Sequence, residues 1–326
     1  MKILGIESTA HTFGAGIVTH KAEILANVRD PFSTKKGGMI PWELMDHHVA
    51  CCDKVLANAL KQAKVTLGDI DIIAYSHGPG IGHALRVGLV SAKTLAKHLG
   101  IALVGVNHCV AHLEIGKVLT HARNPVMLYI SGTNTQVIAQ EHGAYRIFGE
   151  TLDQGIGNML DSFARHAGLG FPGGPLLYAQ SLKSHQFMRL PYSVKGMDVA
   201  FGGLLTHVKR LHDQKKYSLP ALAYSLQEHA FAMVLEVAER ALAHLGRREL
   251  LLAGGVACNV RLQEMARLLC NARGARLCIP PSSVLVDNGA MIAWTGYMQH
   301  KMMKHRTQDA MLKSAGISPY ERADEA

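Results

Sequence analysis

Short apolar runs separated by turn-forming residues open the chain and predict β-strands. The runs cover residues 3–6 and 15–18, and a third strand is predicted at 22–28. Strands joined by such short turns pair antiparallel. The first 30 residues therefore predict a three-stranded unit, and a loop rich in glycine and proline follows at 31–41.

Segments with helical periodicity then alternate with short apolar strands. Five apolar residues fall near one face of a long predicted helix: Leu44, Val49, Val55, Leu56 and Leu60. The elements predicted in this part of the chain are helices at 43–64, 85–99 and 108–119 and strands at 71–76 and 102–106. This half is therefore expected to be α/β.

The opening pattern of strands returns in the second half of the chain. Strands are predicted at 126–130, 135–140 and 145–149, and the turn Ser131-Gly132 takes the place that Ser8-Thr9 has in the first unit. Helices and later strands follow each unit. The repeat predicts two domains of related architecture; the alternative is a chance similarity between two short hairpins.

Helices dominate the rest of the second half. A Gly/Pro loop at 171–175 interrupts them, residues 180–216 show no regular pattern, and the tail from Lys301 to Arg322 is expected to be only partly ordered. The predicted elements are helices at 157–169, 219–245, 259–270 and 287–294 and a strand at 249–253.

Composition narrows the class of protein without identifying it. The 326 residues suffice for two domains, and 48% hydrophobic with 18% charged residues is a globular composition. The net charge of +9 favours a polyanionic partner, with nucleic acid as the first candidate. A basic surface without a ligand explains the charge equally well.

Cysteine usage and hydropathy indicate where the protein works. The six cysteines form no Cys-x-x-Cys pair, and four of them have apolar neighbours, which indicates reduced thiols in a cytoplasmic protein. The N-terminus lacks the layout of a signal peptide. No uncharged stretch of about 18 apolar residues occurs, so we expect no membrane span.

His108 and His112 are the most specific local signal of chemistry. Their i, i+4 spacing in a predicted helix places both imidazoles on one face, within reach of one metal ion. Imidazole suits zinc, iron, copper and nickel. Cys109 stands where a metalloprotease carries its glutamate, so no hydrolytic base is built in. The alternative is two unrelated histidines among the 19 in the chain.

A closed metal site needs further ligands from elsewhere in the chain. Asp287 is a candidate because it opens a helix after a loop, and Tyr129 is another because it lies near the end of a predicted strand. A phenolate oxygen favours a hard or borderline ion such as ferric iron. Periodicity and spacing do not bring either residue to the histidines.

Glycine-rich turns follow predicted strands at Ser131-Gly132, Gly173-Gly174 and Gly254-Gly255. Glycine lets backbone N–H groups approach a phosphate, although it also simply closes turns. The chain lacks the phosphate-loop motif and the dinucleotide fingerprint. Two carboxylates, Asp153 and Asp161, either contact ribose hydroxyls or stabilise a helix N-terminus.

Several motifs occur in a fixed order along the chain. They are Gly105-Val106-Asn107-His108 with His112, then 128–136, 149–153, 171–175, 254–257 with Asn259, and 287–293. In combination they resemble the universal family of tRNA threonylcarbamoyladenosine synthases, over essentially the whole chain. Residues 192–198 and 319–322 with Asp324 resemble its archaeal and eukaryotic branch, the catalytic subunit of the KEOPS complex.

The resemblance implies a fold and partners. The fold is a two-domain ASKHA fold (the actin, sugar-kinase and Hsp70 architecture) with duplicated RNase H-like domains. An N-terminal lobe would cover 1–122 and a C-terminal lobe 123–326, with a helical insertion at about 157–245 and the final helix packed back on the N-terminal lobe. The implied partners are tRNA, a small atypical protein kinase subunit and a small dimerising subunit. Basic pairs are candidate phosphate contacts: Lys209-Arg210, Lys215-Lys216 and Arg247-Arg248.

The resemblance also implies a site. One metal ion, iron by resemblance with zinc and magnesium open, would be held by His108, His112, Tyr129 and Asp287. ATP or threonylcarbamoyl-AMP would be bound by Tyr129, Ile130, Ser131, Gly132, Thr133, Asp161, Gly174 and Asn259. The reaction would be a metal-assisted acyl transfer, in which the exocyclic amine of the adenosine beside the anticodon attacks the carbamoyl carbon and AMP leaves. No covalent enzyme nucleophile is required.

Departures from the family pattern concern the nucleotide site. Thr133 replaces the second glycine of Gly-Gly-Asn-Thr-Gln, Tyr178 replaces a carboxylate, Gly202 replaces a serine, and Ile40 replaces a histidine. The implied metal ligands are intact. Two alternatives stay open: a non-catalytic nucleotide-binding scaffold, and a metalloprotease, which the missing glutamate disfavours.

Overall fold

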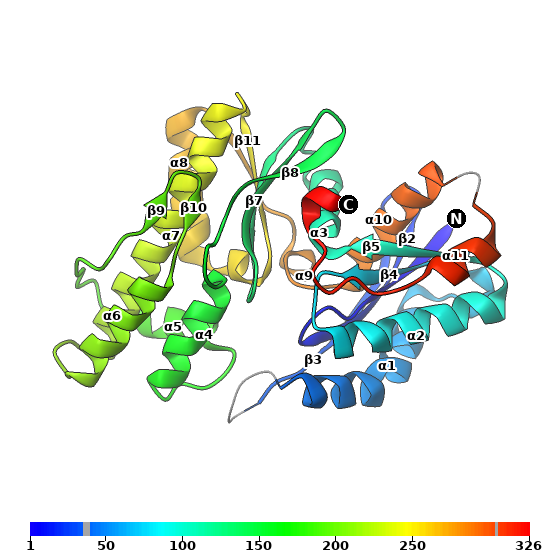
Figure 1. Cartoon of the computed structure of the whole chain (residues 1–326), viewed down its shortest axis with the longest axis horizontal. Coiled ribbons are helices and arrows are strands. Elements are labelled where there is room, and N and C mark those ends of the chain that lie inside the picture. The colour runs from blue at the N-terminus through cyan, green and yellow to red at the C-terminus, as the bar shows by residue number, and fades with distance from the viewer. Residues whose placement is uncertain (35–39, 304–305) are drawn as a thin grey trace. The chain divides into compact units, whose positions relative to one another are not determined.

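The computed structural model describes residues 1–34, 40–303 and 306–326, and Figure 1 shows its course. Gly37 and Gly38 of the predicted loop lie outside these residues. Contacts divide the described chain into two units. Of the described residues, unit 1 takes 1–32, 40–121, 281–303 and 306–326, and unit 2 takes 33–34 and 122–280. The segment from Pro281 onward thus groups with the N-terminal residues; the resemblance placed it in the lobe at 123–326, with the final helix packed back on the N-terminal lobe.

Unit 1 is built on a five-stranded mixed sheet. Its order is β3-β2-β1-β4-β5, with β1 antiparallel to β2 and parallel to β4. The strands are β1 (Lys2–Glu7), β2 (Thr12–Thr19), β3 (Ile24–Pro31), β4 (Ile72–Gly78) and β5 (Ala102–Asn107). The three predicted opening strands are confirmed, with the third shifted by a few residues.

Helices cover both faces of this sheet. Leu4 and Ile73 belong to a core shared with α1 (Pro41–Ala63) and α2 (Gly82–Leu99). Ile3 and Ile72 belong to a second core, shared with α3 (His108–Thr120) and α10 (Gly289–Met302). Neighbouring strand residues thus point to opposite cores, which explains continuous apolar runs in place of alternation. Short elements complete the unit: η1 (Leu67–Asp69), α9 (Ser282–Leu285), α11 (Gln308–Ser314) and η3 (Ala323–Glu325).

The start of α10 lies directly on the backbone of β1 and β2. A Cβ atom at Gly5 would come within 2.2 Å of the carbonyl oxygen of Gly289, and one at Gly16 within 2.2 Å of the nitrogen of Ala290. Only glycine permits this approach. Two glycines in neighbouring strands therefore fix the start of α10, and with it the residues just before that helix.

Unit 2 repeats the sheet of unit 1. Its order is β12-β11-β6-β7-β8, in which β6, β7 and β8 form the antiparallel unit and β11 runs parallel to β6. Read from β8 to β12, this is the order of unit 1 read from β3 to β5. The strands are β6 (Val126–Ile130), β7 (Thr135–Glu141), β8 (Ala144–Glu150), β11 (Glu249–Ala253) and β12 (Arg276–Cys278). The predicted duplication is confirmed.

The helices of unit 2 contradict one prediction. Residues 180–216 were expected to be irregular, yet they contain α6 (Gly202–Asp213) and a short hairpin of β9 (Val194–Lys195) and β10 (Asp198–Val199). The buried residues of α6 follow a helical spacing, at Leu204, Leu205, Val208 and Leu211, but Gly202 and Gly203 at its start have low helix propensity. The remaining elements are α4 (Ile156–His166), α5 (Gly173–Ser181), α7 (Leu219–His244), η2 (Gly255–Cys258) and α8 (Val260–Arg273).

The C-terminal tail is also more regular than expected. Lys304 and His305 lie outside the described residues, but the following part forms α11 and η3. It is joined to β4 through the hydrogen bond from the Ser318 nitrogen to the His77 oxygen, at 2.7 Å. The prediction of a partly ordered tail is therefore wrong for 306–326. Among the described helices, none has the length and hydropathy to span a membrane.

Candidate metal and nucleotide site

The two histidines that were predicted as metal ligands lie in the first two turns of α3, where β5 ends. Asn107 caps the helix: its Oδ1 accepts hydrogen bonds from the nitrogens of Cys109 at 3.0 Å and Val110 at 3.2 Å. His108 and His112 are buried, and their ring centroids lie 4.9 Å apart. The predicted helix and the shared face of the two imidazoles are confirmed.

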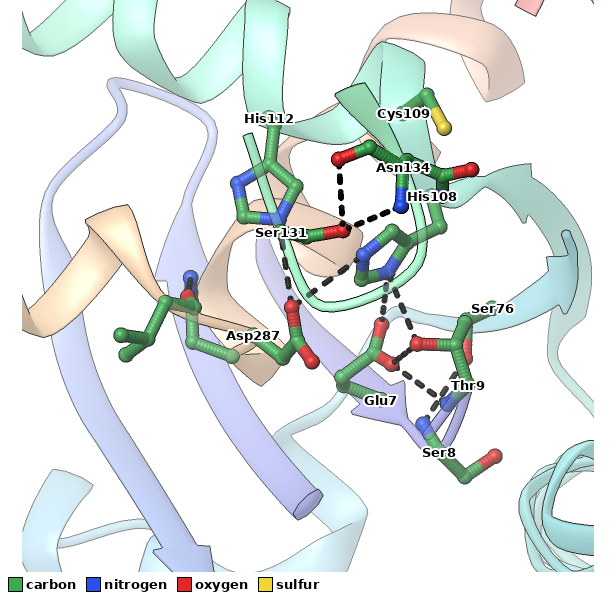
Figure 2. Close-up of polar contacts among 12 residues, drawn as sticks. Glu7, Ser8, Thr9, Ser76, His108, Cys109, His112, Ser131, Asn134 and Asp287 are labelled. Carbon is green, nitrogen blue, oxygen red and sulfur yellow. Dashed lines mark hydrogen bonds and ion pairs between the residues drawn. The ribbon is translucent and has the colours of Figure 1, made fainter. Parts of the chain in front are cut away.

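Asp287 meets both histidines, as Figure 2 shows. Its Oδ1 lies 3.4 Å from Nε2 of His108 and 3.5 Å from Nε2 of His112. One potential ligand atom from each of the three residues lies within 4.8 Å of the others. The structure thus brings together three of the residues that the resemblance implied as ligands, across 175 positions of sequence.

The position of Asp287 follows from the start of α10. Asn288 caps this helix, because its Oδ1 accepts a hydrogen bond from the Met291 nitrogen at 3.0 Å. The Nδ2 of Asn288 donates to the carbonyl oxygens of Val284 and Val286. The cap and the glycine contacts under α10 together direct the Asp287 carboxylate toward α3.

Glu7, at the end of β1, holds His108 from the other side. Its Oε2 accepts a hydrogen bond from Nδ1 of His108 at 3.0 Å. Its Oε1 accepts from the nitrogen and the hydroxyl of Thr9, at 2.6 and 2.5 Å. In metal sites, a carboxylate that accepts a hydrogen bond from Nδ1–H of a neutral imidazole leaves the lone pair of Nε2 for the metal. Sequence analysis missed this residue; the only signal was a charge directly after an apolar strand.

Burial and neighbouring charges shift the pKa of all three residues in this cluster. Burial alone would lower the pKa of His108, but the charge of Glu7 and hydrogen bonds to Asp287 and Glu7 raise it to about 10. Burial, together with the charge of His108, lowers the pKa of His112. Burial alone would raise the pKa of Asp287, yet hydrogen bonds from both histidines hold it well below its usual range. Two imidazoles therefore share one carboxylate at close range.

This donor set fits a transition-metal ion. Two imidazole nitrogens and one carboxylate oxygen form the protein part of many zinc and non-haem iron sites, with open positions for other ligands. The side chain of Asp287 is 13% exposed and that of His112 is fully buried, so a bound ion would be mostly shielded from water. Glu7 supplies the outer hydrogen bond that such histidines usually make.

The C-terminal tail supports the helix that carries the histidines. The Nδ2 of Asn107 donates to Oε2 of Glu321 at 2.8 Å and to the carbonyl oxygen of Arg322 at 3.2 Å. The same Oε2 lies 2.5 Å from Nε2 of His77. Burial alone would raise the pKa of Glu321, but the hydrogen bond with His77 lowers it. The cap of α3 is thus fastened by the last residues of the chain.

The implied nucleotide residues lie in unit 2. Tyr129 and Ile130 end β6, and the turn from Ser131 to Asn134 is closed by the hydrogen bond from the Ser131 nitrogen to the Asn134 oxygen, at 2.8 Å. The carbonyl oxygens of Ser131 and Gly132 accept from the first nitrogens of α4. Tyr129 belongs to a different unit from the histidines, and its role as a ligand stays a prediction.

Thr133 fits this turn without backbone strain. Five described non-glycine residues have a left-handed φ, and Thr133 is not among them. Thr133 is also exposed to solvent. Replacement of the family glycine therefore costs no conformational energy at this position.

The other implied nucleotide residues also hold the local structure. The Oδ1 of Asp161 accepts from the Gly173 nitrogen at 2.7 Å, which joins α4 to the Gly173-Gly174 start of α5. Asn259 caps α8 through its Oδ1, and its Nδ2 donates to Gln227 at 2.7 Å. Each residue thus has a structural role beside the nucleotide contact that the resemblance implies.

Asp153 fits its alternative interpretation as a helix cap. Its carboxylate accepts hydrogen bonds from the nitrogens of Phe201 at 3.0 Å and Gly202 at 2.6 Å, at the start of α6. A Cβ atom at Gly202 would lie 3.0 Å from Oδ2 of Asp153. This tight contact is a physical reason for glycine in place of the family serine.

Comparison with known proteins places the chain among tRNA-modifying enzymes. Residues 23–294 match the family described as TsaD, tRNA N6-adenosine threonylcarbamoyltransferase. Proteins named tRNA N6-adenosine threonylcarbamoyltransferase are similar to it: that of Thermococcus kodakarensis is 50% identical over 96% of both chains, and that of Thermococcus gammatolerans is 51% identical over 91% of this chain and 90% of its own. A probable bifunctional tRNA threonylcarbamoyladenosine biosynthesis protein of Methanothermobacter thermautotrophicus is 48% identical over 100% of this chain and 60% of its own length.

Solved structures at low identity agree on the fold. HypF of Thermococcus kodakarensis has a TM-score of 0.63 at 14% identity, over 95% of this chain and 49% of its own. A ROK family glucokinase of Streptomyces griseus has a TM-score of 0.52 at 12% identity, over 91% of this chain and 100% of its own. The fold is the ASKHA fold, in agreement with the duplicated sheets. By the match of residues 23–294 and the identity to full-length relatives, the chain belongs to the tRNA N6-adenosine threonylcarbamoyltransferase family.

Proposed function

We infer that the chain is a tRNA N6-adenosine threonylcarbamoyltransferase, an acyltransferase of tRNA modification. The observation that carries this conclusion is 50% identity, over 96% of both chains, to a transferase of that name. The buried cluster of His108, His112 and Asp287 supports it, because the donors of a metal-assisted transfer are present and preorganised. The net charge of +9 is compatible with a tRNA substrate.

The finer assignment of the metal site is part of the proposal. His108, His112 and Asp287 would hold one ion, with Tyr129 as a further ligand and iron as the expected metal. When bound, such an ion polarises a carbonyl and orients oxygen ligands. Glu7 keeps the proton of His108 on Nδ1, so that Nε2 can act as a ligand. Asp287 stays ionised, because its pKa lies well below the usual range.

The donor and the acceptor of the transfer follow from the same assignment. Threonylcarbamoyl-AMP, or ATP in the isolated protein, would lie over the turn after β6, where backbone nitrogens can face phosphate oxygens. Asp161, Gly174 and Asn259 would line the ribose and base side. The adenosine amine beside the anticodon would attack the carbamoyl carbon, and the bond to AMP would break. No residue of the chain forms a covalent bond with the substrate.

Other subunits belong to the proposal as well. A small atypical kinase and a small dimerising subunit would complete the enzyme in the cytoplasm. The name and extra length of the bifunctional relatives support a second protein working beside this one. The basic pair Lys209-Arg210 stays a candidate for phosphate contacts, although Lys209 also donates to Ser162 at 2.9 Å.

The test is a complete transfer assay with a metal-ligand variant. The protein, threonylcarbamoyl-AMP, tRNA and partner subunits are mixed, and modified adenosine is measured by mass spectrometry of the digested tRNA. His108→Ala with His112→Ala should lower the rate by more than about 100-fold, because the metal loses two ligands. His98→Ala, on the exposed end of α2, is the matched control and should keep full activity.

Two outcomes would contradict the proposal. Full activity of the double variant would exclude the metal role of the two histidines. No activity of the unmodified protein in the complete mixture would favour the nucleotide-binding scaffold instead.

A further inference from the structure

We propose that His166, His212 and Asp213 form a second metal site, for a divalent first-row transition ion of the zinc type. The three residues lie in unit 2, at the C-terminal ends of α4 and α6. They are separate from every residue that the transfer reaction uses. The proposal stands independently of the proposed function.

The three side chains converge on one carboxylate oxygen. The Oδ1 of Asp213 lies 2.7 Å from Nε2 of His166 and 3.6 Å from Nδ1 of His212. The two imidazole centroids are 5.5 Å apart, with their planes at 70°. One potential ligand atom from each residue lies within 4.8 Å of the other two. This is close to the geometry of the His108 cluster, where the corresponding distances are 3.4 and 3.5 Å.

His212 is the observation that points to a ligand. Its Nδ1 is buried and has no hydrogen-bond partner, although Asp213 lies just beyond hydrogen-bond distance. A hydrogen bond between His166 and Asp213 would explain those two residues without His212. Since a buried nitrogen without a partner is unfavourable, an ion in reach of its lone pair is a better explanation of the third side chain.

The distances suit zinc-type coordination. Zinc binds imidazole nitrogen at about 2.0–2.1 Å and carboxylate oxygen at about 2.0–2.2 Å, so tetrahedral ligand atoms lie roughly 3.3 Å apart. The observed separations of 2.7 and 3.6 Å lie on either side of this value. Small rotations of the side chains of His166 and Asp213 would equalise them. Two imidazoles and one carboxylate suit zinc and its first-row neighbours, and not magnesium or calcium.

Exposure decides the character of the site. The side chain of Asp213 is 61% exposed and those of His166 and His212 are 29% and 31% exposed. Water can therefore fill the remaining coordination positions and carry the ion in and out. Arg210 and Lys209 lie one turn before on α6 and repel a cation. We therefore expect weaker binding than at the buried cluster.

Binding would tie α4 to α6. These helices are already joined by the hydrogen bond from Lys209 to Ser162. An ion held by His166 on α4 and by His212 and Asp213 on α6 would add a second link at their ends. Because α4 also carries Asp161, the ion would stiffen a helix of the proposed nucleotide site. The site thus has the form of a structural clamp that responds to the metal supply.

The test measures metal binding by the full chain with the first site removed. The parent carries His108→Ala and His112→Ala, and the probes are Zn²⁺ and Co²⁺ alone, followed by calorimetry and visible absorption. When the parent also carries His166→Ala and His212→Ala, one equivalent of the metal ion should bind at least tenfold more weakly. The Co²⁺ spectrum of the parent should lack a thiolate charge-transfer band, which separates this site from the group formed by Asp30, His47 and Cys51.

Two further measurements keep the test decisive. Saturating Zn²⁺ should raise the unfolding temperature of the parent by roughly 5 °C. It should leave the unfolding temperature unchanged in the variant in which all four histidines are replaced. Asp213→Asn, which keeps the side-chain shape, should also weaken binding. His207→Ala, a partly exposed histidine on the same helix, is the matched control and should bind like the parent.

Defined results would overturn the proposal. Equal zinc affinity and stoichiometry with and without His166 and His212 would exclude the site. Equal loss in the His207→Ala control would show unspecific binding by surface histidines and would exclude it as well. A thiolate charge-transfer band in the Co²⁺ spectrum of the parent would place the ion at a cysteine and would exclude the site.

Discussion

The chain carries two imidazoles and one carboxylate in close contact at two places, and the two differ in what surrounds them. At His108, His112 and Asp287 the side chains are almost fully buried, and Glu7 fixes the outer nitrogen of one imidazole. At His166, His212 and Asp213 the carboxylate is mostly exposed, and a buried imidazole nitrogen lacks a hydrogen-bond partner.

The difference shows which surroundings distinguish the proposed catalytic metal site from a donor set of the same residue types. Donor types and distances nearly agree, so they do not separate the two clusters. Burial strengthens each electrostatic contact, and the second carboxylate selects the tautomer that can bind a metal. The exposed cluster has neither feature, and we expect it to exchange its ion with solvent.

The largest expected effect comes from making the buried cluster more like the exposed one. Glu7→Gln removes the charge that holds the Nδ1 proton of His108, and metal affinity should fall by about 10–100-fold. Competition with a chelating dye measures this value. Glu43→Gln, in the exposed first turn of α1, is the control. An unchanged affinity in Glu7→Gln would show that burial alone distinguishes the two clusters.

A second change acts on the helix that carries the buried pair. Asn107→Ala removes the cap of α3 and its hydrogen bonds to Glu321 and Arg322, and should lower the free energy of unfolding by about 1–2 kcal/mol. Denaturant unfolding measures the loss, with Asn58→Ala on the exposed face of α1 as control. Metal affinity should fall with it. Stability equal to that of the control would mean that the tail adds nothing to the site.

The smallest expected effect concerns α6, the helix that carries His212 and Asp213. The carboxylate of Asp153 caps the start of this helix. Partial burial alone would raise the pKa of Asp153, but hydrogen bonds from Phe201, Gly202, Gln154 and Thr151 lower it below 3.8, the ordinary value of an aspartate. Its contribution to stability is therefore complete above pH 3.8 and is lost as the pH falls through the lowered pKa.

The size of this effect is limited by solvent, because Asp153 is exposed. Asp153→Asn should cost about 0.5 kcal/mol at pH 6 and flatten the fall in stability between pH 4 and 2. Asp46→Asn, on the exposed side of α1, is the control. Stability that falls between pH 4 and 2 equally in Asp153→Asn and in the unmodified protein would mean that the charged cap Asp153 responds to pH no more than the neutral cap Asn107 does.

Sequence predicted the parts of the molecule that depend on neighbours in the chain. The spacing of His108 and His112 located a shared helix face, and the repeated strand pattern located both sheets. Asp287 came from family resemblance, because no local signal links it to residues 175 positions earlier. Glu7 was missed for the same reason: its partner His108 is 101 positions away.

The exposed cluster shows the same limit more sharply. His212 and Asp213 are adjacent in sequence and offer no metal-binding spacing, and His166 joins them only through the packing of α4 on α6. Because residues 180–216 were expected to be irregular, no helix was predicted that could position His212 and Asp213. Pairwise contacts between distant helices are set by the tertiary fold, and periodicity carries no information about them.

The packing of the C-terminal tail and of α10 against the first strands has a consequence for folding during synthesis of the chain. The main part of unit 2, residues 122–280, is one continuous segment, whereas unit 1 brings its first strand together with residues 281–326. At about 5–20 residues per second, a ribosome adds that final segment roughly 2–9 s after unit 2 has been synthesised. Residues 122–280 can therefore fold on the ribosome first, while unit 1, which carries the proposed metal ligands His108, His112 and Asp287, needs residues 281–326 before it can fold. A nascent chain that stalls before Pro281 would hold His108 and His112 without Asp287 and without the tail that fastens their helix.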